Sequence, residues 1–512
     1  MRFSLNRRSL HGGSSSCESV MKETLSLIEK TKNLNFMVGV REAEDLIEDA
    51  KQCDIKKNSY EKRSPIDGFT LAVKDNFCTK NMPTTCASKM LANYRPTFNA
   101  TVVNKAESAG AIVIGKTNMD EFAMGSGTVD SIFGPTKNPW NSQQIKFDLV
   151  IPKTGLKIDE QIKGSSLKEN DFLISGGSSG GSAVAVATGA ARIGLGSDTG
   201  GSVRIPGAWT GVTTLKPTYG ALSRHGMIPL VNSLDTPGLF ARSVEDITSF
   251  FNVLSGPDEK DATTLRNPIE NITLNQEQFD PSVLTIGIPQ EYHCQDMADS
   301  VLETWSMAAD LLEKHSVKLV NVSLPHTRYA LTCYSILNAC EVASNMSRYD
   351  GLEYGLRGSD ETSLNSMYSS SRGQGFSETV RGRIIAGNYF LLAENYETYF
   401  GKAMQLRRLI QQDFIKAFQE VDLLLTPATV SAAPKFSDFS DLDNRTQVTK
   451  QDYCTQPVNL SGLPAATVPV RLSEDGLPLS LQLIAPFRGE SRLLQLCHWL
   501  EQRFQFPHMV IS

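Results

Sequence analysis

The sequence predicts a single α/β domain. Short apolar segments of strand character alternate with longer segments of helical periodicity along most of the chain. Neither an internal repeat nor a long low-complexity linker interrupts this alternation. Such a pattern is typical of a sheet with helices packed against it. A length of 512 residues would also fit about three average domains. The lack of a linker is the observation that favours a single domain.

The N-terminal segment has a composition of its own. Residues 1–17 carry three arginines, several serines and no acidic residue, and they lack the apolar core of a secretory signal. This composition is typical of an organelle transit peptide. We therefore expect a mitochondrial transit segment over 1–17 and one domain over 18–512. Apolar residues at helical spacing then predict two helices between residues 19 and 53.

The middle of the chain holds the next expected elements. These are a strand within 67–76, a helix over 102–109, a strand over 111–115, a strand at 172–174 and a small apolar helix over 183–192. The stretch at about 141–171 is polar and aperiodic, with lysines and acids in near balance. Segments of this length without periodicity rarely belong to a core. It is therefore predicted to be a surface insertion.

The C-terminal half continues the alternation. We expect strands over 284–288, 317–322 and 421–426, a helix over 301–314, and the longest helical stretch over 384–420.

Composition excludes several classes of protein. Lysine and arginine number 50 and aspartate and glutamate 56, so the net charge of −6 argues against a basic nucleic-acid surface. No segment approaches the roughly 18 consecutive apolar residues of a membrane span. The nine cysteines are scattered without a C-x-x-C pair, which argues against a disulfide scaffold and a zinc ribbon.

Two segments rich in glycine and serine, Gly176–Ser182 and Gly196–Ser202, carry the strongest chemical signal. A phosphate-binding loop would need a lysine after its last glycine, and neither segment has one. A nucleophile elbow fits G-x-S-x-G at Gly176–Gly180, and its base would be a histidine such as His225. A third interpretation pairs a serine with Lys74 at the end of a buried strand, because burial lowers a lysine pKa and leaves an amine that accepts a proton.

Three spaced motifs resemble the amidase signature family. They are Ala72–Asn76, Gly176–Ser182 and Ser197–Arg204, followed by Lys216–Gly220. Within this family, Met119–Gly125 and Pro457–Pro464 are similar to glutaminase subunits of glutamyl-tRNA(Gln) amidotransferases, and Thr85–Ser88 and the insertion to their mitochondrial forms. The resemblance runs from about Ile66 to Phe506 and implies a central mixed β-sheet covered by helices on both faces.

The resemblance also implies a Ser–Ser–Lys mechanism. Its residues would be the nucleophile Ser202, the bridging serine Ser178 after a cis Gly177–Ser178 peptide, the base Lys74, and the oxyanion-hole N–H groups of Thr199, Gly200 and Gly201. Ser202 would attack the side-chain amide of glutamine, ammonia would leave, and water would hydrolyse the glutamyl ester. Neither a metal nor an organic cofactor is implied in this chain.

The resemblance places the glutamine α-carboxylate on Arg383 and the α-ammonium on Asp452. Gly382 interrupts the basic run, so Arg381 stays open as the carboxylate ligand. Beside the nucleophile, Asp198 and Arg204 are expected to form an ion pair that fixes the loop.

Two further serines, Ser179 and Ser182, are secondary candidates for the site, because hydroxyls at a helix N-terminus more often cap the helix.

The implied partners are subunits B and C of the amidotransferase. The ammonia would convert Glu-tRNA(Gln) to Gln-tRNA(Gln) in mitochondrial translation, with ATP and Mg²⁺ bound by the partner and tRNA reached through the complex. The expected location is the mitochondrial matrix. The alternative is a free-standing serine amidase acting on another small or lipid amide, and a lipid amide would need neither Arg383 nor Asp452.

Overall fold

The computed structural model describes residues 16–57, 64–140, 145–158, 171–275, 278–360 and 362–512. Its strands are β1 (Met37–Val40), β2 (Thr70–Lys74), β3 (Ile112–Thr117), β4 (Phe147–Val150), β5 (Lys157–Ile158), β6 (Ile193–Asp198), β7 (Thr213–Lys216), β8 (Thr236–Ala241), β9 (Thr285–Pro289), β10 (Lys318–Val322), β11 (Leu423–Pro427), β12 (Ala465–Leu472), β13 (Pro478–Ile484) and β14 (His508–Ile511).

Its helices are α1 (Cys17–Lys30), α2 (Ala43–Lys57), α3 (Thr101–Ser108), α4 (Gly180–Ala187), α5 (Arg204–Thr210), α6 (Val244–Leu254), α7 (Asp299–Lys314), α8 (Ala330–Met346), α9 (Leu364–Gly375), α10 (Glu378–Leu391), α11 (Lys402–Ala417), α12 (Phe436–Ser440), α13 (Asn444–Gln451), α14 (Gln456–Ser461) and α15 (Glu490–Phe504). Short 3-10 turns and one π-helical segment lie between them.

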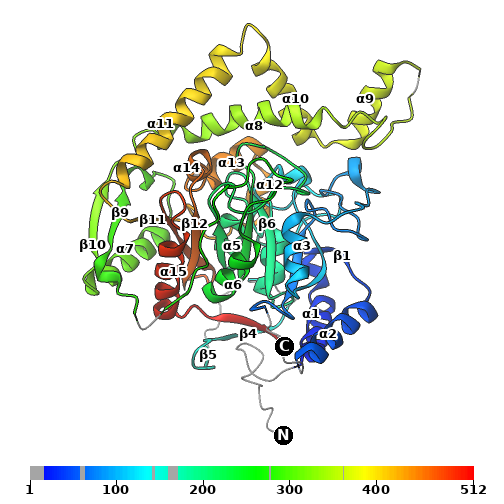
Figure 1. Ribbon diagram of the computed structural model, residues 1–512. Helices are drawn as coiled ribbons and strands as arrows, with labels where there is room; N and C mark the ends of the chain where they lie inside the picture. The colour runs from blue at the N-terminus through cyan, green and yellow to red at the C-terminus, as the bar shows by residue number, and fades with distance from the viewer. Residues whose placement is uncertain (1–15, 58–63, 141–144, 159–170, 276–277, 361) are drawn as a thin grey trace.

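The strands form one large sheet through the middle of the molecule (Figure 1). It has 11 strands in the order β1-β3-β2-β6-β8-β7-β12-β13-β11-β9-β10. β2 is parallel to both β3 and β6, whereas β8, β7, β12 and β13 pair antiparallel with their neighbours. The sheet is therefore mixed, and the predicted fold class is confirmed.

Alternating residues of β2 show how helices cover both faces of this sheet. Leu71 and Val73 belong to the main core, which also holds apolar residues of α3, α6 and α15. Ala72 points to the opposite face and packs with α1, α2 and α4. Successive side chains of a strand point to opposite faces, so β2 is buried on both sides, and Lys74 follows Ala72 toward the face of α4.

The parallel pairing of β2 with β6 brings two motifs together. Leu71, Ala72 and Val73 pair with Ile193, Gly194 and Leu195. Because parallel strands end at the same edge of a sheet, Lys74 at the end of β2 lies beside the segment that leaves β6.

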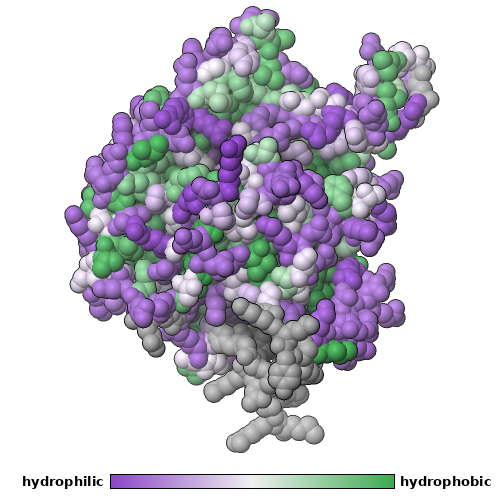
Figure 2. Space-filling view, in the orientation of Figure 1, coloured by the Kyte–Doolittle hydropathy of each residue, from purple (hydrophilic) through white to green (hydrophobic). Residues whose placement is uncertain are grey.

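The longest predicted helical stretch is not one element. Residues 384–420 form the end of α10, the π-helical segment Glu397–Gly401 and α11, with a break after α10. α10 and α11 pack on α8 and project from the sheet as a hairpin (Figure 1). Figure 2 shows apolar patches among the polar side chains of this projection, and Ile385 and Tyr389 are among its exposed residues. The prediction of a single helical stretch was wrong because periodicity does not show where a helix turns back.

Two predicted segments are only partly described. Residues 1–15 of the expected transit segment lie outside the described residues, whereas Ser16 caps α1 and Cys17 begins it. Of the expected insertion, residues 141–144 and 159–170 also lie outside them. Its described part forms β4 and β5, and β4 pairs antiparallel with β14 in a second, three-stranded sheet.

Most other expected elements are present. α1, α2, β2, α3, β3, α4, β9, α7, β10 and β11 lie where strand or helix character was predicted, within a few residues. The exception is 172–174, which makes only isolated bridges, from Leu173 to Lys435 and from Ile174 to Lys137.

Candidate active site

Lys74 lies at the centre of a cluster of serine hydroxyls. Its Nζ is 2.8 Å from Ser178 Oγ, 2.8 Å from Ser179 Oγ and 3.0 Å from Ser197 Oγ. The Gly177–Ser178 peptide bond is cis. Lys74 and Ser178 are both fully buried. The structure therefore brings together two of the three predicted triad residues.

The partners of the three hydroxyls show which one can give Lys74 a proton. Ser179 Oγ donates to the carbonyl of Ser197, at 3.2 Å, and Ser197 Oγ accepts a bond from Asn76 Nδ2, at 3.0 Å. Among the described residues, Ser178 Oγ has no partner other than Lys74. A neutral amine has two N–H donors and one lone pair. Lys74 can donate to all three hydroxyls, and a neutral Lys74 that donates to Ser179 and Ser197 would keep its lone pair for the proton of Ser178.

Burial favours the neutral form of Lys74. It lowers the pKa of this lysine to about 7, although the negative charges of Asp120, Asp198 and Asp235 act in the opposite direction. A group whose pKa lies near the working pH is suited to both accept and return a proton.

Ser202 lies in the loop after β6 and contacts the segment of Ser178 through its backbone. Its carbonyl accepts the N–H of Ser179 at 3.2 Å. Ser202 is 9% exposed, whereas Ser178 is 0% exposed, so a substrate can reach Ser202 first. No hydrogen bond joins the Ser178 and Ser202 hydroxyls in the described part of the chain. A proton relay through Ser178 therefore needs these two hydroxyls to come within hydrogen-bond distance.

The loop before Ser202 presents unpaired backbone donors. Across the described residues, the N–H groups of Thr199, Gly200 and Gly201 make no hydrogen bond, which leaves them available to an oxyanion. Gly201 has φ of 147°, and a Cβ there would overlap the Thr455 side chain. The nucleophile loop therefore requires glycine at this position.

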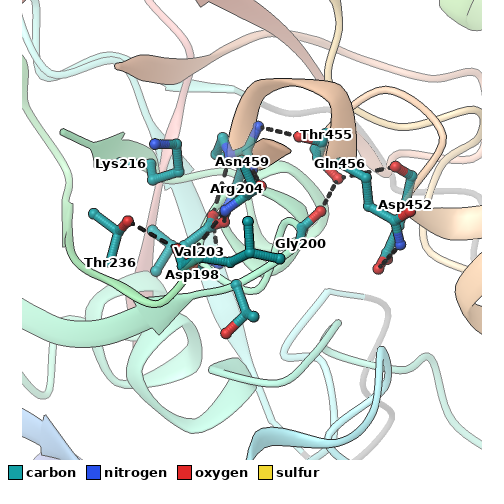
Figure 3. A network of polar contacts seen from close by, with 12 residues as sticks. Asp198, Gly200, Val203, Arg204, Lys216, Thr236, Asp452, Thr455, Gln456 and Asn459 are labelled. Carbon is teal, nitrogen blue, oxygen red and sulfur yellow. Dashed lines mark hydrogen bonds and ion pairs between the residues drawn. The ribbon is translucent and has the colours of Figure 1, made fainter. Parts of the chain in front are cut away.

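A buried ion pair holds the other side of this loop (Figure 3). Arg204 donates to both carboxylate oxygens of Asp198, at 3.0 and 2.9 Å, and both side chains are fully buried. Burial alone would raise the pKa of Asp198, but the charge and hydrogen bonds of Arg204 hold it at about 2. Asp198 also accepts from Asn459 Nδ2 at 2.9 Å. The predicted ion pair is confirmed.

Arg383 and Asp452 approach the nucleophile loop from two different elements. Arg383, on α10, donates to Asn338 Oδ1 at 3.1 Å and to Asn444 Oδ1 at 2.9 Å. Asp452 ends α13 and is buried. The ring of Tyr334 lies against Gly200, and its hydroxyl accepts a bond from Asn338 at 3.1 Å. Thr455 Oγ1 donates to the carbonyls of both Gly200 and Asp452. The two predicted ligands of glutamine therefore share one region beside the oxyanion donors.

Arg381 is directed elsewhere. It is exposed and donates to the carbonyl of Gly373 at 2.8 Å. Burial raises the pKa of Asp452, and the positive charge of Arg383 acts in the opposite direction.

Two sequence-based expectations need correction. Ser179 stands at the N-cap position of α4 but makes no side-chain capping bond, because its hydroxyl is held by Lys74 and Ser197. Ser182 contacts Thr117 Oγ1 at 2.7 Å and donates to the carbonyl of Leu195 at 3.0 Å. These serines tie α4 to the sheet instead of capping it.

His225 does not support the nucleophile-elbow interpretation. Its Nδ1 contacts Thr101 Oγ1 at 3.2 Å, and its ring lies 5.5 Å from the ring of Phe98, tilted by 34°. The described contacts of His225 include none with Ser178 or Ser202.

Three contacting residues had no predicted role, although two of them, Asn76 and Ser197, lie within the signature motifs. Asn76 and Ser197 complete the surroundings of Lys74, and Thr455 donates to the carbonyl of Gly200 at 2.6 Å. Thr455 comes from a segment remote in sequence, so only the fold reveals its role.

The described residues show neither a metal site nor a membrane-spanning helix. They contain no group of three or more His, Cys, Asp or Glu side chains suited to a metal ion. In the same part of the chain, the helices are all too short or too polar to cross a membrane.

Comparison with known proteins decides the family. The Amidase family matches residues 20–146 and 169–494, leaving out residues 147–168 within the predicted insertion. The chain belongs to the amidase family. Among amidase proteins it is 49% identical over 488 residues to the A subunit of the mitochondrial glutamyl-tRNA(Gln) amidotransferase of Anopheles gambiae, covering 95% of this chain and 94% of the relative.

Other relatives carry the same description. The A subunit of the human mitochondrial glutamyl-tRNA(Gln) amidotransferase is 47% identical, over 95% of this chain and 90% of its own. The crystal structure of the A subunit of the Thermotoga maritima glutamyl-tRNA(Gln) amidotransferase superposes with a TM-score of 0.76 at 32% identity, covering 99% of both chains. This amidase chain therefore belongs with the A subunits of these amidotransferases, and the predicted mitochondrial location is confirmed.

Proposed function

We propose that this chain is the glutaminase subunit of a mitochondrial glutamyl-tRNA(Gln) amidotransferase and hydrolyses glutamine to glutamate and ammonia. The observation that carries the proposal is the position of Lys74, whose Nζ lies 2.8 Å from Ser178 Oγ. The loop that leads to Ser202 supplies the unpaired N–H groups of residues 199–201. A serine whose proton can reach a neutral lysine is an activated nucleophile. Membership of the amidase family supports the same chemistry.

In the proposed reaction, Ser202 Oγ attacks the side-chain carbonyl carbon of glutamine while its proton passes through Ser178 to Lys74. The N–H groups of Thr199, Gly200 and Gly201 stabilise the oxyanion, each such donor contributing about 3 kcal/mol in comparable sites. Lys74 then returns the proton through Ser178 to the departing nitrogen, and ammonia leaves. Water hydrolyses the resulting ester by the same relay and regenerates Ser202.

In the proposed pocket, the guanidinium of Arg383 holds the α-carboxylate and the carboxylate of Asp452 holds the α-ammonium. An arginine matches a carboxylate with two parallel hydrogen bonds. Opposite charges on α10 and at the end of α13 would orient an amino acid so that its side-chain amide reaches the loop of Gly200.

The proposed acceptor side consists of subunits B and C, with ATP and Mg²⁺ bound by the partner and tRNA contacted through the complex in the mitochondrial matrix. The net charge of −6 supports the assignment of tRNA binding to the partner subunits, because direct binding of a nucleic-acid backbone requires a basic surface. The names of the relatives support it as well.

The test is ammonia release by the complex purified from mitochondria with this chain as bait. We expect release from glutamine but little from butyramide, which lacks both charged groups, and none from a Ser202→Ala bait. Comparable turnover of butyramide, or of a fatty-acid amide, with no preference for glutamine would establish the free-standing amidase instead. The proteins that co-purify with an active bait would identify the acceptor subunits.

Replacing Arg383 with lysine should weaken glutamine binding. Lysine cannot form the two parallel hydrogen bonds, and the loss of one charged hydrogen bond typically reduces the binding free energy by about 1.5–3 kcal/mol. The KM for glutamine should therefore rise roughly 10- to 100-fold with kcat nearly unchanged. Steady-state kinetics of the complex provide the measurement. The matched control is Arg381→Lys on the same helix, which should keep KM within about twofold. An equal effect of both substitutions would refute the assignment to Arg383.

Glutamine binding should also depend on pH through Asp452. Burial raises the pKa of this carboxyl to about 7 in the free protein. Below that pH the carboxyl is protonated and cannot pair with the substrate ammonium, so the KM for glutamine should rise as pH falls through 7. KM measured from pH 6 to 8.5 tests this. Asp452→Asn should give a high KM with a flat profile, and a steep profile in that variant would contradict the assignment.

A further inference from the structure

The loop of residues 125–130 packs directly against the segment that carries Ser178. The buried carboxylate of Asp120 accepts the N–H groups of Thr128 and Val129, both at 2.9 Å, and of Asp130 at 3.1 Å. A Cβ on Gly177 would overlap both the Asp120 carboxylate and the backbone at Ser126. The loop and the Ser178 segment therefore leave no room for a side chain at Gly177.

The hydroxyl of Thr128 bridges the two sides of Ser178. It donates to the carbonyl of Gly176 at 2.8 Å and accepts the N–H of Gly180 at 2.9 Å. These two partners lie two residues before and two residues after the serine. Thr128 is fully buried and has a left-handed backbone conformation, with φ of 55°, and the carboxylate of Asp120 holds its backbone N–H.

The Ser178 side chain itself has little to hold it. Within the described residues, Lys74 is the partner of its hydroxyl. The direction of that hydroxyl therefore depends on the backbone from Gly176 to Gly180, which is the stretch that the Thr128 hydroxyl spans.

We propose that Thr128 is a positioning residue that fixes Ser178 between Lys74 and Ser202. The inference rests on the proposed function and adds to it a residue outside the Ser–Ser–Lys set. A proton relay requires its donor and acceptor within hydrogen-bond reach, and displacement by about 1 Å lowers turnover about 100-fold. Losing the hydroxyl frees the Ser178 segment while Asp120 still holds the 125–130 loop.

The same loop also contacts Asp452, the proposed ligand of the glutamine α-ammonium. The KM for glutamine therefore gives the proposal a second test. Ser126 Oγ donates to Asp452 Oδ1 at 3.3 Å. If substitution of Thr128 displaced the whole loop, Asp452 would move and the KM for glutamine would rise. A local loss of the Thr128 hydroxyl lowers kcat and leaves KM in place.

The experiment compares Thr128→Val, Thr128→Ala and Thr128→Ser in the full chain within its complex. Thr188→Val is the matched control, because the buried Thr188 hydroxyl donates at the other end of α4, to Val184 and Ala185. Steady-state turnover of glutamine gives kcat and KM. The rate at which a sulfonyl fluoride modifies Ser202 gives a second readout, since Ser202 Oγ displaces fluoride and passes its proton to Lys74 through Ser178.

We expect Thr128→Val and Thr128→Ala to lower kcat roughly 10- to 100-fold with KM within about threefold. Thr128→Ser should recover most of the rate, and Thr188→Val should keep it. Because Thr128 acts through Ser178, Thr128→Val should cause no further loss in a Ser178→Ala background. Multiplicative losses in that double variant, or no recovery in Thr128→Ser, would overturn the proposal.

The sulfonylation rate separates failure of this inference from failure of the proposed function. A wild-type complex that modifies Ser202 quickly but does not hydrolyse glutamine would refute the glutaminase. Slower sulfonylation of Thr128→Val and Thr128→Ala would still support the positioning role in that case. An unchanged sulfonylation rate in both variants would refute that role whatever the substrate.

Discussion

Replacing Lys74 with methionine is expected to lower the kcat for glutamine by about 10⁴-fold, since removing one member of a catalytic unit costs nearly as much as removing all of it. Methionine fills a similar volume but cannot accept the proton that passes through Ser178. Ser202→Ala should cause a comparable loss, and the Lys74→Met, Ser202→Ala double variant should be no slower than either. Losses that multiply would show that the two residues act independently.

The pH dependence of kcat should follow the titration of the Lys74 amine. The pKa of Lys74 is lowered to about 7 by burial, so the neutral base is depleted below pH 7 and kcat should rise through that pH to a plateau. Lys216 provides a matched control because burial lowers its pKa to about 7 as well, yet its Nζ donates to the carbonyl of Pro217. The kcat midpoint should persist in Lys216→Met. Its disappearance there would contradict the role of Lys74.

Replacing Arg204 with methionine is expected to destabilise the protein by about 3–5 kcal/mol, the usual effect of leaving one charge of a buried pair without its partner. Asp198 would keep Asn459 and the loop N–H groups but lose two charged hydrogen bonds. Denaturant unfolding of the purified chain measures the change, and glutaminase activity should fall with it because Asp198 anchors the loop of Ser202. Full activity in Arg204→Met would refute the anchoring role.

Two comparisons separate this effect from a general loss of charge. Arg492 pairs with Asp422 at 2.6 Å but is 52% exposed, so Arg492→Met should cost less than about 1 kcal/mol. Adding Asp198→Asn to Arg204→Met removes both buried charges and should recover part of the stability. A double variant less stable than Arg204→Met would contradict an ion-pair origin.

Local pattern in the sequence predicted the elements that carry the catalytic groups. The apolar run before Lys74 is the buried strand β2. The first glycine- and serine-rich segment leads into α4, and the second begins at the end of β6. The Asp198–Arg204 pair could be predicted because its members are close in sequence and opposite in charge. The resemblance to the amidase signature family added the pairing of Lys74 with Ser178, which no local pattern contains.

The remaining features depend on contacts between distant segments. β4 forms within a polar stretch because β14, at the far end of the chain, pairs with it, and strand formation of this kind follows tertiary context. The hydroxyl of Ser179 was expected to cap α4, yet Lys74 competes for it successfully. Thr128 lies in a loop without periodicity. Its proposed role follows only from the hydrogen bonds of its hydroxyl with Gly176 and Gly180.

The nucleophile loop and its neighbours are held by hydrogen bonds to segments from almost the whole length of the chain, which has a consequence for folding. Lys74 meets Ser178 across 104 residues, and Asp198 meets Asn459 across 261. Arg204 also donates to Gln482 on β13, at 2.7 Å. Contacts between remote segments form slowly because a long loop must close before they contribute. During synthesis, the C-terminal strands must emerge before Asp198 and Arg204 are satisfied, so the chain gains an ordered nucleophile loop only near completion.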